Sequence, residues 1–274
     1  MTDTTASRNA PSLLLIGAGK MGQAMLRGWR QSSQLAKITV IDPAPSPDLP
    51  GMVDLLNPDL AALQDAPPDI VVLAVKPQFL NEIAAHIEGI PQDCLVISIL
   101  AGIRIEQLQA LLPGRRIIRA MPNTPAALGK GVTVMCADAS VSDSAHIQAT
   151  QLLETVGAVN WLEDENLMDA VTAISGSGPA YLFHFAEALA EAGKALGLPD
   201  DLAMQLARQT VAGAGFMLDA LPESAAQLRE NVTSPGGTTA AALEVLRDSG
   251  ALAELLRQAT QAAAKRSQEL SDTN

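Results

Sequence analysis

The chain has 274 residues, of which 48% are hydrophobic and 3% aromatic, and its formal net charge is −12. This length allows one large domain or two ordinary ones, with a core built mainly from aliphatic side chains. Nucleic-acid-binding proteins normally present a basic face, so the acidic balance argues against that class of partner. The two cysteines and three histidines lack the spacing of a zinc site, and no metal is expected.

Residues 1–12 are polar and contain no apolar stretch of the kind found in secretory signals, so we expect a disordered tail there. The longest apolar region, residues 167–198, is interrupted by glycine, proline and charged residues and is too broken for a membrane span. Cys94 and Cys136 stand alone in apolar runs, which is typical of buried, reduced thiols. These features favour a cytoplasmic protein without a membrane partner.

Residues 13–162 alternate short apolar runs with segments of helical pattern. Such continuous apolar runs are typical of strands in a parallel sheet that is covered on both faces. The alternation predicts right-handed crossovers and a Rossmann-like, doubly wound α/β sheet. The expected strands are 13–16, 38–41, 70–74, 95–99, 117–120, 132–136 and 158–162, and the expected helices are 20–31, 59–64, 78–88, 105–112 and 142–156.

A glycine-rich turn follows the first predicted strand and opens the first predicted helix. It reads Gly17-Ala18-Gly19-Lys20-Met21-Gly22. A GxGxxG string alone is weak evidence, but in this position it predicts a dinucleotide-binding turn. Gly17 permits the tight turn, Gly19 lets the backbone approach a pyrophosphate, and Gly22 allows close packing of helix on strand.

Asp42 stands at the end of the second predicted strand. A carboxylate there can accept hydrogen bonds from the ribose 2′-hydroxyl of NAD, and it would repel the 2′-phosphate of NADP. No Lys or Arg occurs from Asp42 to Leu56, so the electrostatics favour NADH. The alternative is that Asp42 only caps the turn before Pro43.

Three further loops follow predicted strands, where ligands of doubly wound sheets bind. In the last of them, prolines stiffen the chain around Asn123 and Thr124 and should leave both polar side chains presented. Lys76 either approaches a phosphate or only covers the surface. The residues expected to line the cofactor cleft here are Ala74, Val75, Lys76, Pro77, Ala101, Gly102, Met121, Pro122, Asn123 and Thr124.

After residue 162 no strand pattern returns, which predicts an all-α domain over 163–274 beside a dinucleotide-binding domain over 13–162. Residues 209–221 have almost no polar face, and a helix that is apolar all round has to be buried. A helical unit of roughly 110 residues has little interior, so we expect a subunit interface and a homo-oligomer. The alternative is a well-packed monomeric bundle. The expected helices are 179–196, 200–218, 225–232, 238–247 and 252–270.

The loop Ser234-Pro235-Gly236-Gly237-Thr238-Thr239 interrupts this helical pattern. Glycines expose backbone N–H groups, and hydroxyls donate or accept hydrogen bonds. The loop also opens a helix, whose first N–H groups have no internal partners and attract anions. It is therefore a predicted binding site for an acidic ligand.

Taken together, these motifs resemble the pyrroline-5-carboxylate reductase family over nearly the whole chain from Leu13. Besides the glycine turn and the 234–239 loop, the resemblance rests on three runs: 75–77, 118–125 and 175–181. It implies a Rossmann domain and a helical domain that forms intertwined dimers, often in a ring of dimers. It also implies hydride transfer from NAD(P)H to the C=N bond of 1-pyrroline-5-carboxylate, giving L-proline in the last step of proline biosynthesis.

The resemblance also assigns roles. The substrate carboxylate would bind the N–H groups of Gly236, Gly237 and Thr238 with help from the Ser234 hydroxyl. Thr239 would hydrogen-bond the ring nitrogen and orient or supply its proton; the alternative for Thr239 is a plain helix cap. The stretch from Ser175 through Ser177 to Gly178 would form a wall near the nicotinamide. An imine is basic enough to be protonated before reaction, so no catalytic histidine is required.

Two departures from the family pattern leave questions open. Ser224-Ala225-Ala226 stands where the family often has His-Pro-Gly, and Asp42 does not suit the NADPH that many members prefer. One rival interpretation is another imine or β-hydroxyacid reductase, although the latter carry an Asn four residues after a Lys, where this chain has Leu198 after Lys194. A second is a non-catalytic dinucleotide-binding protein.

Overall fold

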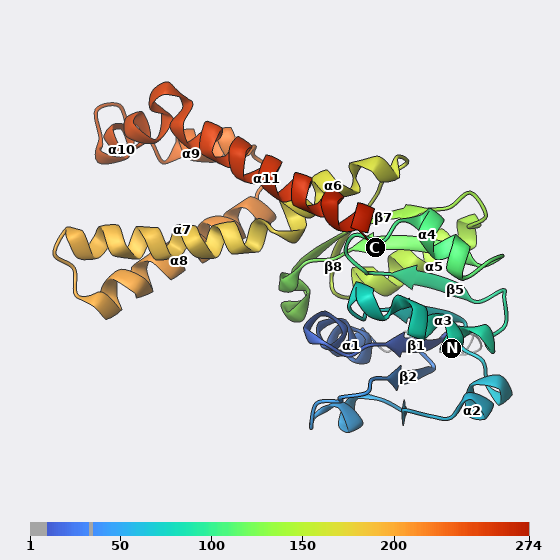
Figure 1. Cartoon of the computed structure of the whole chain (residues 1–274). Coiled ribbons are helices and arrows are strands. Elements are labelled where there is room, and N and C mark those ends of the chain that lie inside the picture. Colours follow the sequence, from blue (N-terminus) through green and yellow to red (C-terminus); the bar gives the residue numbers. More distant parts are fainter. Residues whose placement is uncertain (1–9, 33–34, 274) are drawn as a thin grey trace, which may run out of the picture. The chain divides into compact units, whose positions relative to one another are not determined.

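The computed structural model describes residues 10–32 and 35–273 (Figure 1). Most of the expected disordered tail, residues 1–9, lies outside this part, and Ser12 already belongs to the first strand. The chain forms two compact units. The first runs to Gly176 and takes in the chain from Ala263 onward, and the second spans Ser177–Ala262. The boundary predicted between 162 and 163 therefore falls inside the first unit.

The first unit is built on an eight-stranded sheet with the order β3-β2-β1-β4-β5-β6-β7-β8. Every neighbouring pair is parallel except β6 and β7, which are antiparallel, so the predicted doubly wound α/β fold is confirmed. Strand β3 was not predicted, because two residues are too few to show a pattern. The strands are β1 (Ser12–Ile16), β2 (Lys37–Ile41), β3 (Leu55–Leu56), β4 (Ile70–Leu73), β5 (Leu95–Ser98), β6 (Arg116–Met121), β7 (Gly131–Ala137) and β8 (Gly157–Trp161).

Helices cover both faces of this sheet, which explains the continuous apolar runs (Figure 1). Successive strand residues point to opposite faces. Leu13 and Leu15 therefore join a core with residues of α1 and α5, while Leu14 and Ile16 join a second core with residues of α3 and α4. The helices of this unit include α1 (Lys20–Ser32), α2 (Leu60–Asp65), α3 (Leu80–Glu88), α4 (Ile105–Leu111) and α5 (Asp143–Glu154).

Two later segments complete the first unit. The 3₁₀ turn η4 (Glu165–Leu167), helix α6 (Met168–Val171) and the π-helical turn η5 (Thr172–Gly176) follow β8, and Met168 is part of the second core. The last part of α11 (Ala251–Thr273) also belongs here, where the Ser267 hydroxyl donates to Asp169 Oδ1 at 2.6 Å. A helical pattern alone does not reveal which unit a helix packs against, so the sequence could not assign these two segments to the first unit.

The second unit is entirely helical, as predicted. It holds α7 (Gly178–Ala195), α8 (Asp200–Ala220), α9 (Ala225–Asn231), α10 (Thr238–Arg247), the 3₁₀ turn η6 (Asp248–Gly250) and the first part of α11. Gly197 adopts a φ of +93° between α7 and α8, a left-handed conformation that glycine reaches without strain. The break expected between the helices 179–196 and 200–218 is thus confirmed.

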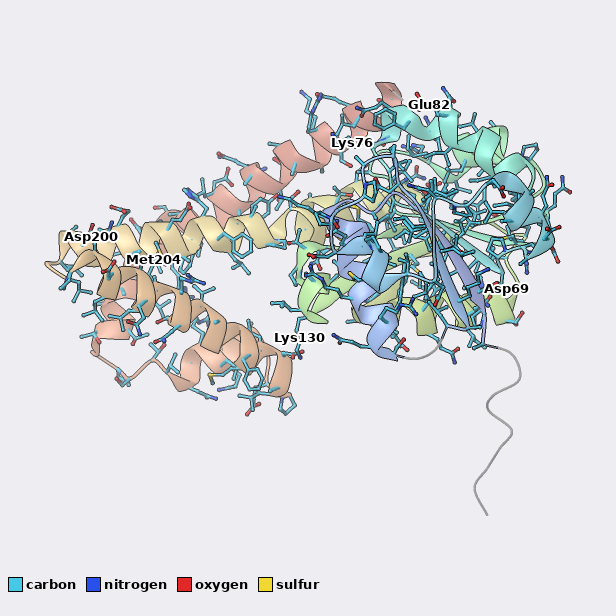
Figure 2. All side chains as sticks on the ribbon, turned by 90° about the horizontal axis from the view of Figure 1, so that it is seen from below. Asp69, Lys76, Glu82, Lys130, Asp200 and Met204 are labelled. Atoms are coloured by element: carbon cyan, nitrogen blue, oxygen red, sulfur yellow. The ribbon has the colours of Figure 1, made fainter. Side chains whose placement is uncertain are left out.

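Large apolar side chains of the second unit are exposed in the single chain. Phe183 is 65% exposed, Phe216 67% and Val245 73%, whereas the buried residues described in these helices are small alanines, such as Ala190 and Ala203. Figure 2 shows the side chains that project from α8, whose beginning is marked by Asp200 and Met204. This exposure does not fit the alternative of a well-packed monomeric bundle, which would bury these side chains. Among the residues described, no helix has both the length and the apolar character to span a membrane.

Candidate active site

The three glycines of the 17–22 turn occupy different environments. Gly17 has a φ of +92°, and a Cβ added to it would lie 2.7 Å from the Ala74 carbonyl oxygen. A Cβ added to Gly22 would lie 2.5 Å from the Gly17 carbonyl oxygen. Nothing lies within 4 Å of a Cβ added to Gly19, so the backbone of Gly19 is open to a ligand. This openness is what close approach of a pyrophosphate requires, and ligand binding at the turn stays a prediction.

Asp42 joins this turn to the end of β2. Its side chain is buried, with Oδ2 accepting from the Ala18 N–H at 2.6 Å and Oδ1 from the Ala44 N–H at 2.7 Å. Asn57 holds the Asp42 backbone on both sides, because its Oδ1 accepts from the Asp42 N–H and its Nδ2 donates to the Asp42 carbonyl, each at 2.8 Å. The turn-capping alternative is thus observed. It does not preclude a ribose contact, since a carboxylate has about four acceptor positions.

The loops after β4 and β5 lie at the carboxyl ends of those strands. Lys76 is exposed at the start of the 3₁₀ turn η2 (Pro77–Phe79), as Figure 2 shows. Gly102 has a φ of +72°, and a Cβ added there would lie 3.2 Å from Leu270 Cβ. The end of α11 therefore packs directly against the Ala101-Gly102 loop. Sequence reasoning missed this support, because nothing in the pattern of residues 252–270 indicates its target.

The loop after β6 differs from the expectation at Asn123. Thr124 is exposed, but the Asn123 side chain is buried. Its Nδ2 donates to the Ser175 carbonyl at 3.0 Å, and its Oδ1 accepts from the Val132 N–H at 2.9 Å. The prediction that both polar side chains are presented is therefore wrong for Asn123, because internal partners on β7 and η5 take up its amide.

Ser175 and Ser177 are both half-buried. The Ser175 hydroxyl donates back to the Val171 carbonyl at 3.1 Å, and the Thr172 hydroxyl donates to the Met168 carbonyl at 2.9 Å. Ser177 is the N-cap residue of α7, at the first position of the second unit. Single π-helical turns inside helices occur often at functional sites.

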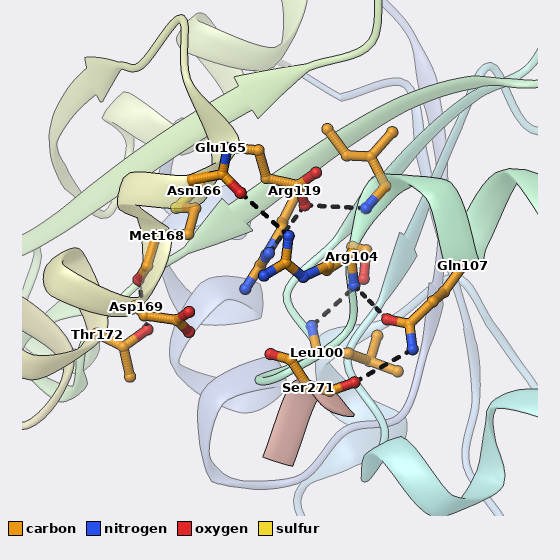
Figure 3. A network of polar contacts seen from close by, with 12 residues as sticks. Leu100, Arg104, Gln107, Arg119, Glu165, Asn166, Met168, Asp169, Thr172 and Ser271 are labelled. Atoms are coloured by element: carbon orange, nitrogen blue, oxygen red, sulfur yellow. Dashed lines mark hydrogen bonds and ion pairs between the residues drawn. The ribbon is translucent and has the colours of Figure 1, made fainter. Parts of the chain in front are cut away.

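A buried ion pair supports the loops of the first unit (Figure 3). The Arg119 side chain is 6% exposed, and its Nη1 lies 2.8 Å from Glu165 Oε1. The same oxygen accepts from the Ile105 N–H at 2.9 Å, at the start of α4. Beside this pair, Arg104 Nη1 donates to Asn166 Oδ1 at 3.2 Å. Sequence reasoning missed the pair, because Arg119 is on a strand and Glu165 is distant from it in the chain.

The cysteines fit the prediction of buried thiols. Cys94 and Cys136 are free and buried. Burial raises the pKa of the Cys94 thiol to about 12, and burial together with the nearby Glu165 carboxylate raises that of Cys136. Thiols of this kind are not nucleophiles at neutral pH. No cluster of potential metal ligands occurs in the described part of the chain.

The 234–239 loop ends in the N-terminus of α10. Gly236 has a φ of +70° and open space around it. Gly237 is the N-cap residue, and its own N–H is already donated to the Ser234 carbonyl at 3.0 Å. Thr239 lies in the first turn and is half-buried, so the interpretation of Thr239 as the cap is wrong. Because glycine has no side chain to cap the helix, the amides of the first turn, beginning with Thr238, are available to an anion.

Comparisons with known proteins match two parts of the chain. Residues 12–102 match the family described as NADP oxidoreductase coenzyme F420-dependent, and residues 165–270 match the family described as pyrroline-5-carboxylate reductase dimerisation. The pyrroline-5-carboxylate reductase of Pseudomonas aeruginosa is 41% identical over 96% of this chain and 98% of its own length. That of Pisum sativum is 37% identical over 95% of this chain and 96% of its own.

Solved structures give the same result. The pyrroline-5-carboxylate reductase of Coxiella burnetii superposes with a TM-score of 0.89 at 35% identity, covering 96% of this chain and 99% of that one. The Plasmodium falciparum pyrroline carboxylate reductase with NADP bound gives a TM-score of 0.82 at 29% identity, covering 95% and 98%. The resemblance inferred from the motifs is confirmed, and the chain belongs to the pyrroline-5-carboxylate reductase family.

Proposed function

We propose that this protein reduces 1-pyrroline-5-carboxylate to L-proline with a hydride from a reduced nicotinamide dinucleotide, the last step of proline biosynthesis. One observation carries the proposal: reductases of this name match nearly the full length of the chain, including both units. The rival readings of a different imine or β-hydroxyacid reductase, or of a non-catalytic binder, lack such support.

For the cofactor, we propose that the reduced dinucleotide binds the first unit at the carboxyl ends of its strands. The open backbone at Gly19 supports contact with the pyrophosphate. Asn123 would take part through its backbone, because its side chain is occupied. The proposed contacts are Gly17, Ala18, Gly19, Lys20, Met21, Gly22, Asp42, Ala74, Val75, Lys76, Pro77, Ala101, Gly102, Met121, Pro122, Asn123 and Thr124.

Between the two coenzymes, we propose a preference for NADH. The buried Asp42 carboxylate retains acceptor positions for a ribose hydroxyl, and no basic residue from 42 to 56 is present to neutralise a 2′-phosphate. The related Plasmodium enzyme was solved with NADP, so NADPH is the competing choice.

For the substrate, we propose that its carboxylate binds the uncapped N-terminus of α10. The amides there attract an anion, and Ser234, Gly236, Gly237 and Thr238 supply the surrounding polar groups. The Thr239 hydroxyl would hydrogen-bond the ring nitrogen. Protonation of the imine gives an iminium that already attracts hydride, so the chain needs to orient the ring rather than supply a strong acid. Ser175 and Ser177 would border the nicotinamide.

For the assembly, we propose a homodimer formed through the second unit and, from likeness to the family, a ring of such dimers. The exposed Phe183, Phe216 and Val245 leave a large apolar surface uncovered in one chain, and monomers rarely expose such patches. A cytoplasmic location is proposed from the two free thiols.

A substrate screen tests the proposed activity. Purified protein is incubated with NADH or NADPH and with 1-pyrroline-5-carboxylate, its six-membered homologue, and a set of β-hydroxyacids and oxo-acids. The proposal predicts the highest kcat/KM with 1-pyrroline-5-carboxylate. Faster turnover of an oxo-acid or β-hydroxyacid would favour the first rival, and cofactor binding without oxidation by any substrate would favour the second.

A further inference from the structure

Asn123 connects three segments of the first unit. It lies just after β6, its Oδ1 accepts from the Val132 N–H of β7, and its Nδ2 donates to the Ser175 carbonyl of η5. The residue is only 8% exposed, so neither bond has strong competition from water. Its side chain is thus positioned by one bond and positions the π-helical turn by the other.

The Ser175 carbonyl needs this donor. In a regular α-helix it would accept from the N–H four residues later, but that residue is Pro179, which has no N–H. The Ala180 N–H, five residues later, is donated to the Ser177 carbonyl instead. The Asn123 amide therefore replaces a helical bond that the sequence itself removes.

A second contact joins the same two segments. A Cβ added to Gly176 would lie 2.7 Å from Met121 Cε, so the end of the Met121 side chain packs directly against η5. Met121 thus contacts Gly176, and Asn123 contacts Ser175. The two segments are held together by close packing as well as by a hydrogen bond.

We propose that Asn123 is a positioning residue, whose amide fixes Ser175 and the π-helical turn relative to the proposed cofactor loop 121–124. This rests on the proposed function, in which that loop and Ser175 border the nicotinamide. Reactions of this kind are sensitive to the alignment of donor and acceptor, and a misplacement of about 1 Å can lower turnover by about 100-fold. The Asn123 side chain then governs kcat rather than affinity for the dinucleotide.

The variant Asn123→Asp isolates the bond to Ser175. The introduced carboxylate still accepts from the Val132 N–H, but it loses the donor and sets an anionic oxygen against the Ser175 carbonyl. Asn160→Asp is the matched control, because it makes the same change on an exposed residue of β8. We expect kcat to fall roughly 10- to 100-fold in Asn123→Asp, with the Kd for the reduced dinucleotide within about twofold of the parent. Asn160→Asp should alter neither.

The pH profile separates positioning from general damage. Protonation gives the introduced carboxyl an O–H that can donate to the Ser175 carbonyl, so the ratio of variant to parent kcat should rise as the pH is lowered. A ratio that is constant with pH, an unchanged kcat, or a loss confined to cofactor affinity would each overturn the proposal.

Hydrogen exchange tests the positioning of η5 by Asn123 independently of catalysis. Exchange of the amides of residues 172–176 should be faster in Asn123→Asp than in the parent, and unchanged in Asn160→Asp. Equal exchange in the two variants would refute the proposal that Asn123 holds this turn. If the parent protein fails to reduce 1-pyrroline-5-carboxylate, the proposed function fails, while this measurement still decides whether Asn123 holds the turn.

Discussion

The buried ion pair between Arg119 and Glu165 gives a prediction about stability. Glu165→Gln keeps the shape of the side chain but leaves the Arg119 guanidinium, 6% exposed, without a counter-charge. Removing one member of a buried pair typically costs about 3–5 kcal/mol. Glu165 is itself 21% exposed, so water solvates part of the site and the lower end, about 3 kcal/mol, is expected. For a folding unit of this size that corresponds to a Tm lowered by about 6–12 °C.

Denaturant titration and thermal unfolding measure this loss. Glu269→Gln is the control, because its pair with Arg266 is exposed and surface pairs contribute at most about 1 kcal/mol. Adding Arg119→Met to Glu165→Gln removes the unpaired charge, so the double variant should be more stable than Glu165→Gln alone. If Glu165→Gln destabilises the protein no more than Glu269→Gln does, the reasoning about the buried pair is wrong.

Three other predictions concern single residues. Asp42→Ser should lower the KM for NADPH relative to the KM for NADH by about tenfold, because it removes a negative charge whose repulsion of the 2′-phosphate is worth about 1–2 kcal/mol. An unchanged ratio of the two KM values would show that Asp42 plays no part in coenzyme selection. Thr239→Ala should raise KM for the imine and lower kcat with the Tm retained, and unchanged kinetics would exclude Thr239 from the site. Burial raises the pKa of the Cys94 thiol to about 12, so Cys94 in the folded protein should resist a disulfide reagent at neutral pH. The unfolded thiol ionises from about pH 8.5 while the folded one stays protonated, so the free energy of unfolding should fall as the pH rises from about 8.5 towards 12. Rapid labelling of Cys94 without unfolding would contradict its burial.

Much of the fold was predictable because its signals are local. The run Leu13–Ile16 is apolar at every position, and each residue is buried in one of the two cores. The glycine turn and the predicted helix 238–247 each coincide with an observed element. Such features depend on neighbouring residues in the chain, which is what sequence patterns record.

The rest depends on contacts between distant residues. Asn123 looked like a presented polar side chain, and only its partners at Val132 and Ser175 show it to be internal. The pattern around Thr239 marked a helix start but did not fix the cap at Gly237, one of two adjacent glycines. The return of α11 to Gly102 has no local signature at all.

Isotope transfer tests the central claim most directly. Reduced nicotinamide carrying deuterium at C4 in the transferred position is mixed with 1-pyrroline-5-carboxylate and the protein, and the product is examined by mass spectrometry and NMR. The proposed reaction consumes one proton and one deuteride, so it predicts L-proline with a single deuterium at C5. Proline without the label, or no proline while the cofactor is oxidised, would contradict direct hydride transfer to the imine carbon.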